Sequence, residues 1–407
     1  MTPVIVHEHG RLTTYGEGKS LTAAQLTTLS AFHARDGNHR YFDLIHRGVR
    51  FKSFVGVLRV GTLTIEVLPK LDDHLSDTHW RNRLLDMLRV TTEVNVHHPT
   101  TSHLRTRPNN ILEYYLELFT GELEQLLHGG LTKAYHPRHG NRTALRGRLL
   151  MSRHLTENVL HRERFYVADT TYDFQHPLNQ ILRQALQLSR RLATAPSLQN
   201  RLAELDLRMP ELPDLRITPA LFDRLTYGRK TTAYRPAIEI ARLLLLNVHP
   251  DIQSGRDDVL ALLFNMNTLW EGFLRQSLQR YLPEGYSVRR QPGQTYWQPE
   301  RGLQAARLEP DLFILREGAP YAILDAKWKR HDRPSANDLQ QLFSYVHHYD
   351  GVRQAALVYP GRRGEVAGQF TYSGFRGDLL WSPVPEGEGS VREWMRGIGR
   401  RVGGWLL

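Results

Sequence analysis

The chain of 407 residues contains no cysteine. This absence excludes disulfide bonds, cysteine-bound zinc, iron–sulfur clusters and thiol nucleophiles. Any chemistry that the protein performs must therefore rest on oxygen and nitrogen groups.

Long apolar segments are absent as well. Apolar runs such as residues 243–246 end far short of the roughly 18–20 residues that are needed to cross a bilayer. The first ten residues, MTPVIVHEHG, also lack the apolar core of a signal peptide. We therefore expect a soluble cytoplasmic protein that has no membrane partner.

Lysine is scarce, because only 7 of the 53 basic residues are lysine and 46 are arginine. Asp and Glu together number 42, so the formal net charge is +11. A basic excess favours a polyanionic partner such as nucleic acid, since each cation placed on a phosphate releases counterions. Genomic base composition is an alternative source of the arginine bias, so the charge alone leaves the partner open.

The first part of the chain mixes strand and helix patterns. In the stretch 54–70, β-branched residues partly alternate with polar ones around Gly61, which predicts a β-hairpin. Apolar residues then recur at helical spacing in the segments 80–88, 111–127, 179–192 and 237–246. The basic stretch 133–153 is expected to be rich in turns. It supplies four candidate contacts to DNA or to a partner protein: Arg138, Arg142, Arg146 and Arg148.

Turn-forming residues gather at 247–255, where we place the main domain boundary. The division gives an N-terminal region, 1–254, and a C-terminal domain, 255–407. The C-terminal pattern predicts a helix over 258–281, strands over 308–315 and 321–327, a helix over 337–348, a strand over 355–359 and a terminal helix over 394–405. The expected fold class is α/β and α+β multidomain, with a mixed β/α N-terminal region and a mixed central sheet in the C-terminal domain.

The predicted strands of the C-terminal domain carry acidic and basic residues where they end. Asp311 lies on one strand, and Asp325 and Lys327 lie at the end of the next. Side chains repeat every two residues along a strand, so Asp325 and Lys327 share a face, and a short connection could bring Asp311 beside them. Two converging carboxylates suit Mg²⁺, which prefers oxygen ligands. A neighbouring ammonium can orient or activate water, so the set points to hydrolysis of phosphodiesters.

Flanking helices add three polar residues. Glu271 interrupts an apolar helical pattern, while Gln341 and Tyr345 share a face of the following helix with Asp338. Tyr345 is a fifth candidate contact to DNA or to a partner protein. Each of these features is ordinary by itself, since an isolated Asp-x-Lys at a strand end is usually surface charge. Their complete order along the chain is much harder to obtain by accident and favours a nuclease.

This order resembles the PD-(D/E)xK nuclease superfamily. The wider sequence resembles the McrC subunit of modification-dependent restriction systems, and the likeness covers nearly the whole chain. Four segments carry it: VGVLRVGTLTIEVLPKL, FNMNTLWEGFLR, ILDAKWK and DLQQLFSYVHHY. The likeness implies a PD-(D/E)xK restriction-endonuclease-like domain over 255–407. One departure is Asn265, where the family often has Asp, so Glu271 would carry the helical carboxylate role alone.

The resemblance also implies individual roles. Asp311 and Asp325 would bind Mg²⁺, with the carbonyl of Ala326 and the carboxylate of Glu271 as further ligands. Lys327 would act on the attacking water, and Gln341 would support the catalytic site.

The partners that the resemblance implies are double-stranded DNA, modified at 5-methylcytosine-type bases, and a hexameric AAA+ GTPase of the McrB type. The N-terminal region would dock on this GTPase and stimulate it. GTP would be held by the partner, because the loop-like stretch 16–20 lacks a full phosphate-binding motif: position 13 is Thr where Gly is required.

Two other functions are compatible with the sequence. The chain could be a non-catalytic activator of an AAA+ motor, since well over half of it lies outside the catalytic domain. It could also be a stand-alone PD-(D/E)xK repair nuclease, a class that shares the Gln-x-x-x-Tyr feature.

Overall fold

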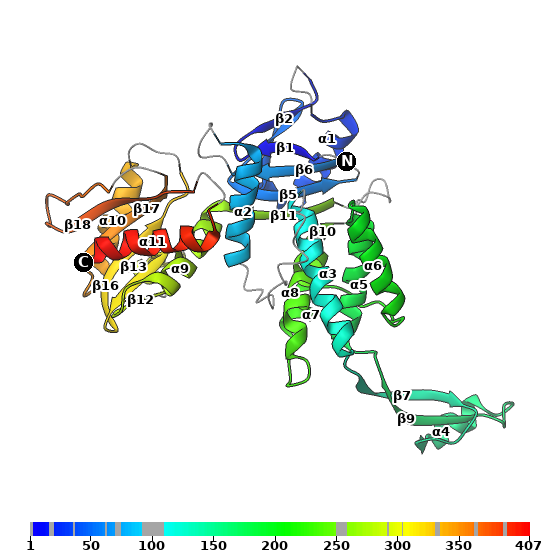
Figure 1. Cartoon of the computed structure of the whole chain (residues 1–407). Helices are drawn as coiled ribbons and strands as arrows, with labels where there is room; N and C mark the ends of the chain where they lie inside the picture. Colours follow the sequence, from blue (N-terminus) through cyan, green and yellow to red (C-terminus); the bar gives the residue numbers. More distant parts are fainter. Residues whose placement is uncertain are drawn as a thin grey trace. The chain divides into compact units, whose positions relative to one another are not determined.

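The computed structural model describes residues 3–15, 20–35, 37–61, 63–69, 75–91, 110–249, 259–290, 293–302, 304–329, 334–361, 365–385 and 389–407. The chain forms two compact units (Figure 1). We call residues 94–262 the central unit, and residues 2–93 together with 263–407 the split unit. No helix in the described ranges is long and apolar enough to span a bilayer.

The split unit joins two segments that are far apart in the sequence. Helix α2 (Asp77–Thr91) of the first segment packs against α9 (Met266–Tyr281) of the second. The packing is close, since a Cβ atom on Gly272 would lie 3.2 Å from the methyl group of Thr91. A side chain larger than glycine would press α9 away from α2.

These compact units differ from the division expected between residues 254 and 255. Residues 2–93 belong with the C-terminal segment, and a hydrogen bond of 3.2 Å from Arg83 to the carbonyl of Gly389 is one of the contacts that join them. Most of the predicted boundary, residues 250–255, lies outside the described part of the chain.

The predicted hairpin of the first segment is confirmed. Strands β5 (Phe54–Val60) and β6 (Leu63–Leu68) pair antiparallel across Gly61, whose φ of 57° is a backbone conformation that glycine adopts readily. Strand β1 (Val4–His7) runs parallel to β6 on its other side.

A second, three-stranded sheet lies in the same segment. Its order is β2 (Arg11–Thr13), β4 (Gly48–Phe51) and β3 (Phe42–Ile45). A short 3-10 helix spans Asn38–Arg40, and helix α1 (Ala23–His33) begins after Thr22, whose hydroxyl accepts from the backbone N–H of Gln25. The loop-like stretch 16–20 lies outside the described residues except for Ser20.

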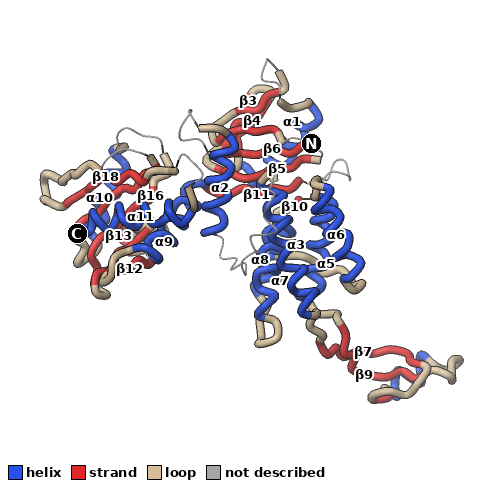
Figure 2. Tube along the Cα trace, in the orientation of Figure 1, coloured by secondary structure: helices blue, strands red, loops and turns tan. Residues whose placement is uncertain are grey.

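The central unit is mainly helical, as Figure 2 shows. Its helices are α3 (Ile111–Gly129), α5 (Pro177–Leu192), α6 (Pro196–Arg208), the short α7 (Pro219–Asp223) and α8 (Arg235–Leu246), with a 3-10 turn at Thr232–Tyr234. The helices predicted over 111–127, 179–192 and 237–246 are confirmed within two residues. Helices α3, α5, α6 and α8 pack on one another and bury their apolar faces.

A long β-hairpin replaces the turns expected over 133–153. Strands β7 (Ala134–Arg142) and β9 (Phe165–Asp173) pair antiparallel over nine residues, and β8 (Arg148–Leu149) and α4 (Met151–Glu157) lie between them in sequence. We call residues 134–173 the arm, which extends from the helices of the central unit (Figure 1). The prediction was wrong because the partner of β7 lies more than twenty residues away, and the local sequence is polar.

The predicted helix over 258–281 is wrong in its first part. Residues Val259–Asn265 form strand β11, which pairs antiparallel with β10 (Val248–His249), and helix α9 begins only at Met266. The side chain of Asn265 accepts from the backbone N–H groups of Asn267 and Thr268 and so caps α9. A short apolar run is compatible with a strand or a helix, and this cap decides where the helix starts.

A five-stranded mixed sheet organises the C-terminal segment. Its order is β12 (Tyr286–Arg289), β15 (Leu312–Arg316), β16 (Ala319–Ala326), β17 (Gln354–Pro360) and β18 (Arg376–Ser382). The first three strands are antiparallel, whereas β16, β17 and β18 are parallel. A separate two-stranded hairpin is formed by β13 (Gln294–Trp297) and β14 (Ala306–Leu308).

Helices cover the sheet on both faces. Helix α10 (Ala336–His348) connects β16 to β17 and packs on the face that carries Phe313, Ile323 and Leu357. Helices α9 and α11 (Val391–Leu406) pack on each other and against β16 and β18. The expected mixed α/β fold with mixed sheets is confirmed.

Two glycines of α11 make different contacts and allow a packing test. A Cβ atom on Gly399 would lie 2.6 Å from the backbone oxygen of Tyr281, whereas one on Gly404 meets no described atom within 4 Å. We expect Gly399→Ala to lower the free energy of unfolding by about 1–3 kcal/mol, because α11 must move away from α9. Gly404→Ala should be neutral or slightly stabilising, by up to about 1 kcal/mol, since alanine favours a helix. Chemical denaturation of both variants checks this, and an equal loss in both would contradict the packing.

Glu122 on α3 provides a test of pH dependence. Its side chain is 3% exposed, and its Oε1 atom has no hydrogen-bond partner within the described ranges. Burial raises the pKa of Glu122 from 4.5 to about 7. The folded state therefore binds this proton more tightly than the unfolded state does, and the free energy of unfolding falls as the pH rises from about 4.5 to about 7.

Glu122→Gln cannot ionise, so we expect it to be more stable than the wild-type protein at pH 8 by about 1–3 kcal/mol, with little difference at pH 4.5. Thermal unfolding at both pH values measures this. Glu211→Gln, at an exposed position of the same unit, is the control. The same shift at both pH values would contradict the expectation.

Candidate active site

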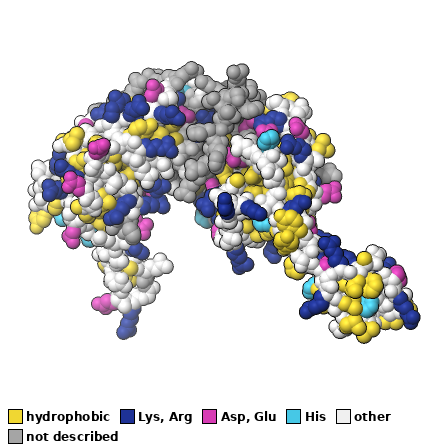
Figure 3. Space-filling model, turned by 60° about the horizontal axis from the view of Figure 1, so that its bottom comes forward, with side chains coloured by type: hydrophobic (Ala, Val, Ile, Leu, Met, Phe, Trp, Pro, Cys, Tyr) yellow, Lys and Arg dark blue, Asp and Glu magenta, His cyan; other side chains and the backbone are white. Residues whose placement is uncertain are grey.

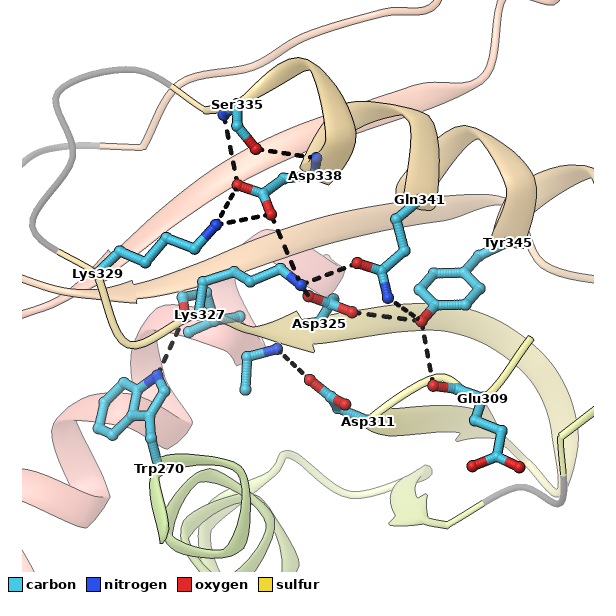
Figure 4. A network of polar contacts seen from close by, with 12 residues as sticks. Trp270, Glu309, Asp311, Asp325, Lys327, Lys329, Ser335, Asp338, Gln341 and Tyr345 are labelled. Carbon is cyan, nitrogen blue, oxygen red and sulfur yellow. Dashed lines mark hydrogen bonds and ion pairs between the residues drawn. The ribbon is translucent and has the colours of Figure 1, made fainter. Parts of the chain in front are cut away.

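The register of two strands brings the predicted aspartates together. Strands β15 and β16 pair Leu312 with Leu324, and the next position of this register places Asp311 opposite Asp325. Opposed residues of an antiparallel pair point to the same face of the sheet. One Asp311 oxygen accepts a hydrogen bond of 2.8 Å from the backbone N–H of Ala326, which fixes the carboxylate at the end of β16 (Figure 4).

Asp325 and Lys327 form an ion pair on the face covered by α10. The Lys327 ammonium lies 2.6 Å from Oδ2 of Asp325, and the Asp325 residue is only 1% exposed. The backbone N–H of Lys327 donates to the carbonyl of Val358 on β17. This bond extends the strand pairing and holds the lysine at the edge of the buried region.

Helix α10 presents two further site residues. The Gln341 amide oxygen accepts from the Lys327 ammonium at 2.9 Å, while its amide nitrogen donates to the hydroxyl of Tyr345 at 2.6 Å. The Tyr345 hydroxyl in turn lies 3.4 Å from Asp325 and 3.1 Å from the carbonyl of Glu309. Figure 4 shows this chain of contacts running from α10 to Asp325 on β16 and to Glu309 between β14 and β15.

Asp338 and Lys329 belong to the same network, although the prediction gave them no role in the site. Asp338 accepts two hydrogen bonds of 2.9 Å from Lys329 and lies 3.8 Å from the Lys327 ammonium. It also caps α10 in a reciprocal pair with Ser335. The sequence signal was present as Ser335-x-x-Asp338, a capping pattern that starts the helix, but the second lysine could not be assigned from spacing.

Glu271 lies within electrostatic range of Asp311 but is bound by arginines. Its carboxylate accepts from Arg290 at 3.0 Å and lies 3.8 Å from Arg275. Its charge contributes to raising the pKa of Asp311, which places it within electrostatic range. The described contacts include no hydrogen bond between Glu271 and Asp311 or Asp325.

The four arginines predicted as DNA or partner contacts are not in this site. All of them lie on the arm of the central unit. Arg138 pairs with Asp173 and Arg142 with Asp169, which ties both to strand β9. Arg146 and Arg148 are exposed and make no ion pair with a described carboxylate.

The clustered carboxylates strongly affect one another. Burial, followed by the charge of Asp325, raises the pKa of Asp311 to about 7 despite the hydrogen bond from Ala326. Burial also raises the pKa of Asp325, although Lys327 opposes this shift. Negative charge in this pocket is therefore costly without a cation.

The pKa of Lys327 is raised as well, which for a lysine favours the charged form. Burial lowers the pKa of Lys327, but the charges of Asp325, Asp338 and Asp311 outweigh it, so the pKa is raised overall. Lys327 is consequently an ammonium ion at neutral pH. This charge state suits binding of an anion and does not suit direct removal of a proton from water.

The donor set fits a hard divalent cation. Asp311 and Asp325 offer carboxylate oxygens on one face, and Ala326, the expected carbonyl ligand, is the last residue of β16, between Asp325 and Lys327 in the chain. Within the described ranges no group of three or more His, Asp or Glu side chains is arranged to hold a metal. Two carboxylates and a carbonyl match Mg²⁺, which keeps several of its waters.

Comparisons with known proteins identify the family and the fold of the chain. The family model described as McrBC 5-methylcytosine restriction system component matches residues 49–360. No curated protein matches the chain.

Two solved structures from Thermococcus gammatolerans are similar to the chain. One is a refined half-complex from a tetradecameric assembly of McrB AAA+ hexamers with bound McrC. Its TM-score is 0.74 at 18% identity, and the match covers 99% of this chain and 100% of that one. The other is a cryo-EM structure of the McrBC complex, with a TM-score of 0.53 and 20% identity, covering 70% of this chain and 89% of that one. At these identities the likeness shows a shared fold. Because the family model matches well over half of the chain, the protein belongs to the McrBC family of restriction-system components.

Proposed function

We propose that this protein is the McrC-type endonuclease subunit of a modification-dependent restriction complex. It would hydrolyse phosphodiester bonds of double-stranded DNA with Mg²⁺, through a PD-(D/E)xK domain formed by the C-terminal segment. The observation that carries the proposal is the cluster of the buried Asp325 with the half-buried Asp311 and Lys327, supported by Gln341 from α10.

Asp311, Asp325 and the carbonyl of Ala326 would hold the Mg²⁺ ion. When bound, the ion supplies positive charge that stabilises the phosphoryl oxygens as the bond is broken. The high pKa of Asp311 reflects first its burial and then the charge of Asp325, and a divalent cation would offset both.

The remaining residues bind and orient the substrate. Lys327, held as an ammonium by Asp325 and Gln341, donates hydrogen bonds to a phosphate oxygen and stabilises the charge that develops there. The amide nitrogen of Gln341 donates to the hydroxyl of Tyr345, which orients the Gln341 side chain. Its amide oxygen can therefore hold the Lys327 Nζ atom in one position. Glu271 is held by Arg290 and Arg275 at the rim and contributes negative charge near Asp311.

The arm is the part that we assign to partner binding. It carries large hydrophobic side chains that are strongly exposed, including Leu145, Met151, Leu155, Val159 and Leu160. Figure 3 shows hydrophobic side chains gathered at its end. An exposed apolar cluster beside Arg146 and Arg148, which pair with no described carboxylate, fits a protein surface with acidic groups. The partner would be a hexameric AAA+ GTPase of the McrB type, which binds GTP and which this chain stimulates.

The first test concerns cleavage. We expect Asp325→Asn and Lys327→Ala each to lower the rate at which the complex reconstituted with the AAA+ partner cuts modified DNA by about 100- to 1000-fold, because each removes charge from the reacting region. Asp350→Asn, an exposed aspartate just after α10, should cut at the wild-type rate. Thermal unfolding confirms that the variants are folded, and near-normal cutting by Asp325→Asn would refute the assigned site.

The second test separates activation from cutting. Asp325→Asn should stimulate GTP hydrolysis by the partner as well as the wild-type protein does, since it alters only the cleavage site. Leu155→Asp combined with Leu160→Asp should reduce the stimulation about 10-fold or more, because charge is introduced into the apolar end of the arm. Leu207→Asp, at an equally exposed leucine of α6, is the control.

Loss of stimulation in the Leu207 control, or none in the arm variant, would contradict the assignment of the arm. Full stimulation by a wild-type protein that cuts no DNA would favour the non-catalytic activator. Efficient cutting by the isolated chain with Mg²⁺ would favour a stand-alone nuclease.

A further inference from the structure

The hairpin of β13 and β14 carries exposed aromatic side chains beside the candidate site. Tyr296 is 50% exposed and Trp297 is 49% exposed, and the four residues of β13 are all exposed. Large aromatic side chains are normally buried because each removes a large apolar area from water. Two adjacent ones left in solvent on a two-stranded hairpin point to a binding surface.

The hairpin is tied to the site through its backbone. The hydroxyl of Tyr349 donates to the carbonyl of Leu308 at 2.8 Å and accepts from the backbone N–H of Gln294 at 3.3 Å, so it clamps both strands to the end of α10. Tyr345, one turn earlier, binds the carbonyl of Glu309. Strand β14 therefore leads into Asp311 through residues that are held in place.

This connection sets the distance to the reacting region. Trp297 pairs with Ala306, which precedes Asp311 by five residues. At about 3.3 Å per residue, these five residues span at most about 17 Å. That length corresponds to about five nucleotides of duplex DNA. The aromatic pair thus lies within reach of DNA whose backbone occupies the site.

A local irregularity shapes the aromatic pair. The register of β13 and β14 shifts between Thr295 and Trp297, so Tyr296 is an extra residue in its strand. Such a bulge interrupts the alternation of side chains and re-aims them. Tyr296 lies edge-on to His348 at the end of α10, with 6.0 Å between ring centroids, whereas Trp297 has no ring contact with a described residue.

Charge on the hairpin and beside it indicates an anionic ligand. Arg289, Arg301 and Arg307 are exposed, and none of them forms an ion pair with a carboxylate in the described ranges. The guanidinium group of Arg307 donates to the carbonyl of Gly293, which positions it between the two strands. Aromatic faces flanked by unpaired arginines are typical of surfaces that stack on bases and bind phosphates.

We infer that the β13–β14 hairpin is a DNA-binding element that stacks Trp297, supported by Tyr296, on a distorted or unpaired nucleotide near the bond that is cut. The inference rests on the proposed endonuclease function. Base faces are covered in an intact duplex, so an aromatic side chain gains contact where a step is kinked or a base is unpaired. Arg289, Arg301 and Arg307 bind the neighbouring phosphates.

The test measures binding of the full-length Asp325→Asn protein, which we expect to cut far more slowly than the wild-type protein, to a fluorescently labelled 20-base-pair duplex. One duplex is fully matched and the other has a single central mismatch. We expect the parent protein to bind the mismatched duplex more tightly than the matched one. Adding Trp297→Ala should weaken binding to the mismatched duplex about 5- to 100-fold relative to the parent protein and should remove the preference. Trp297→Phe should retain most of the affinity, because a smaller ring still stacks.

Two further variants sharpen the test. Arg301→Ala should reduce the dependence of log affinity on log salt concentration by about one unit, as expected for a phosphate contact. Tyr372→Ala removes another strongly exposed aromatic side chain of the same unit and should bind like the parent protein.

The outcomes that overturn the inference are distinct. The inference is refuted if the parent protein and Trp297→Ala bind both duplexes equally well. It is also refuted if Trp297→Ala binds DNA normally but binds the AAA+ partner more weakly, because the hairpin would then be a protein-docking surface. If the wild-type complex cuts DNA while the hairpin variants bind and cut normally, only the hairpin assignment fails. If the wild-type complex neither binds nor cuts DNA, the proposed endonuclease function fails with it.

Discussion

The antiparallel pairing of β15 with β16 is the constraint on which the candidate site depends. This register places Asp311 opposite Asp325 and lets the backbone N–H of Ala326 hold one of the Asp311 oxygens. Because side chains alternate along a strand, the same pairing buries Leu312 and Leu324 on the opposite face. If the pairing register slipped by one residue, the side chains would change faces of the sheet. The leucines would then lie under α10, and the carboxylates would lie against α9 and α11. The hydrophobic core and the polar site are therefore set by one and the same ladder.

Burial of charge gives the site its character. A carboxylate as enclosed as that of Asp325 is costly unless a cation compensates it. Lys327 does so directly, and Asp338 supports Lys327 and Lys329 from the start of α10. The cap of α10 is thus part of the electrostatics of the site, since the carboxylate that begins the helix also faces the two lysines. Such a cluster of mutually perturbed groups is typical of functional sites.

The split unit connects the site to the N-terminal segment by direct contacts. The indole N–H of Trp328, next to Lys327 in the chain, donates to the carboxylate of Glu8 just after β1 at 2.9 Å. Trp270 of α9 lies edge-on to Trp328 and donates to the carbonyl of Val358 on β17. The residues that surround the lysine are consequently packed between the sheet and a segment more than 250 positions earlier in the chain. This contact joins the end of the N-terminal strand β1 to the candidate site.

Local patterns were sufficient for much of the fold and for choosing the residues that the structure brings together in the candidate site. The hairpin around Gly61, the helices of the central unit, and helix α10 follow from alternation, helical periodicity and glycine turns, which depend on neighbours in the chain. Asp311, Asp325, Lys327, Gln341 and Tyr345 could be chosen because their order and spacing are restrictive. Strand β7 and the start of α9 were missed, because a strand needs a partner that local sequence does not specify.

Only the tertiary structure decided how these parts combine. It grouped residues 2–93 with the C-terminal segment. It also showed that Glu271 forms ion pairs with Arg290 and Arg275, and that Asp338 and Lys329 belong to the network around Lys327. It also left Tyr296 and Trp297 in solvent beside the site. The physical reason is that residue type and spacing determine which side chains share a face of one element, whereas burial, charge compensation and exposure depend on what packs against that face from distant parts of the chain.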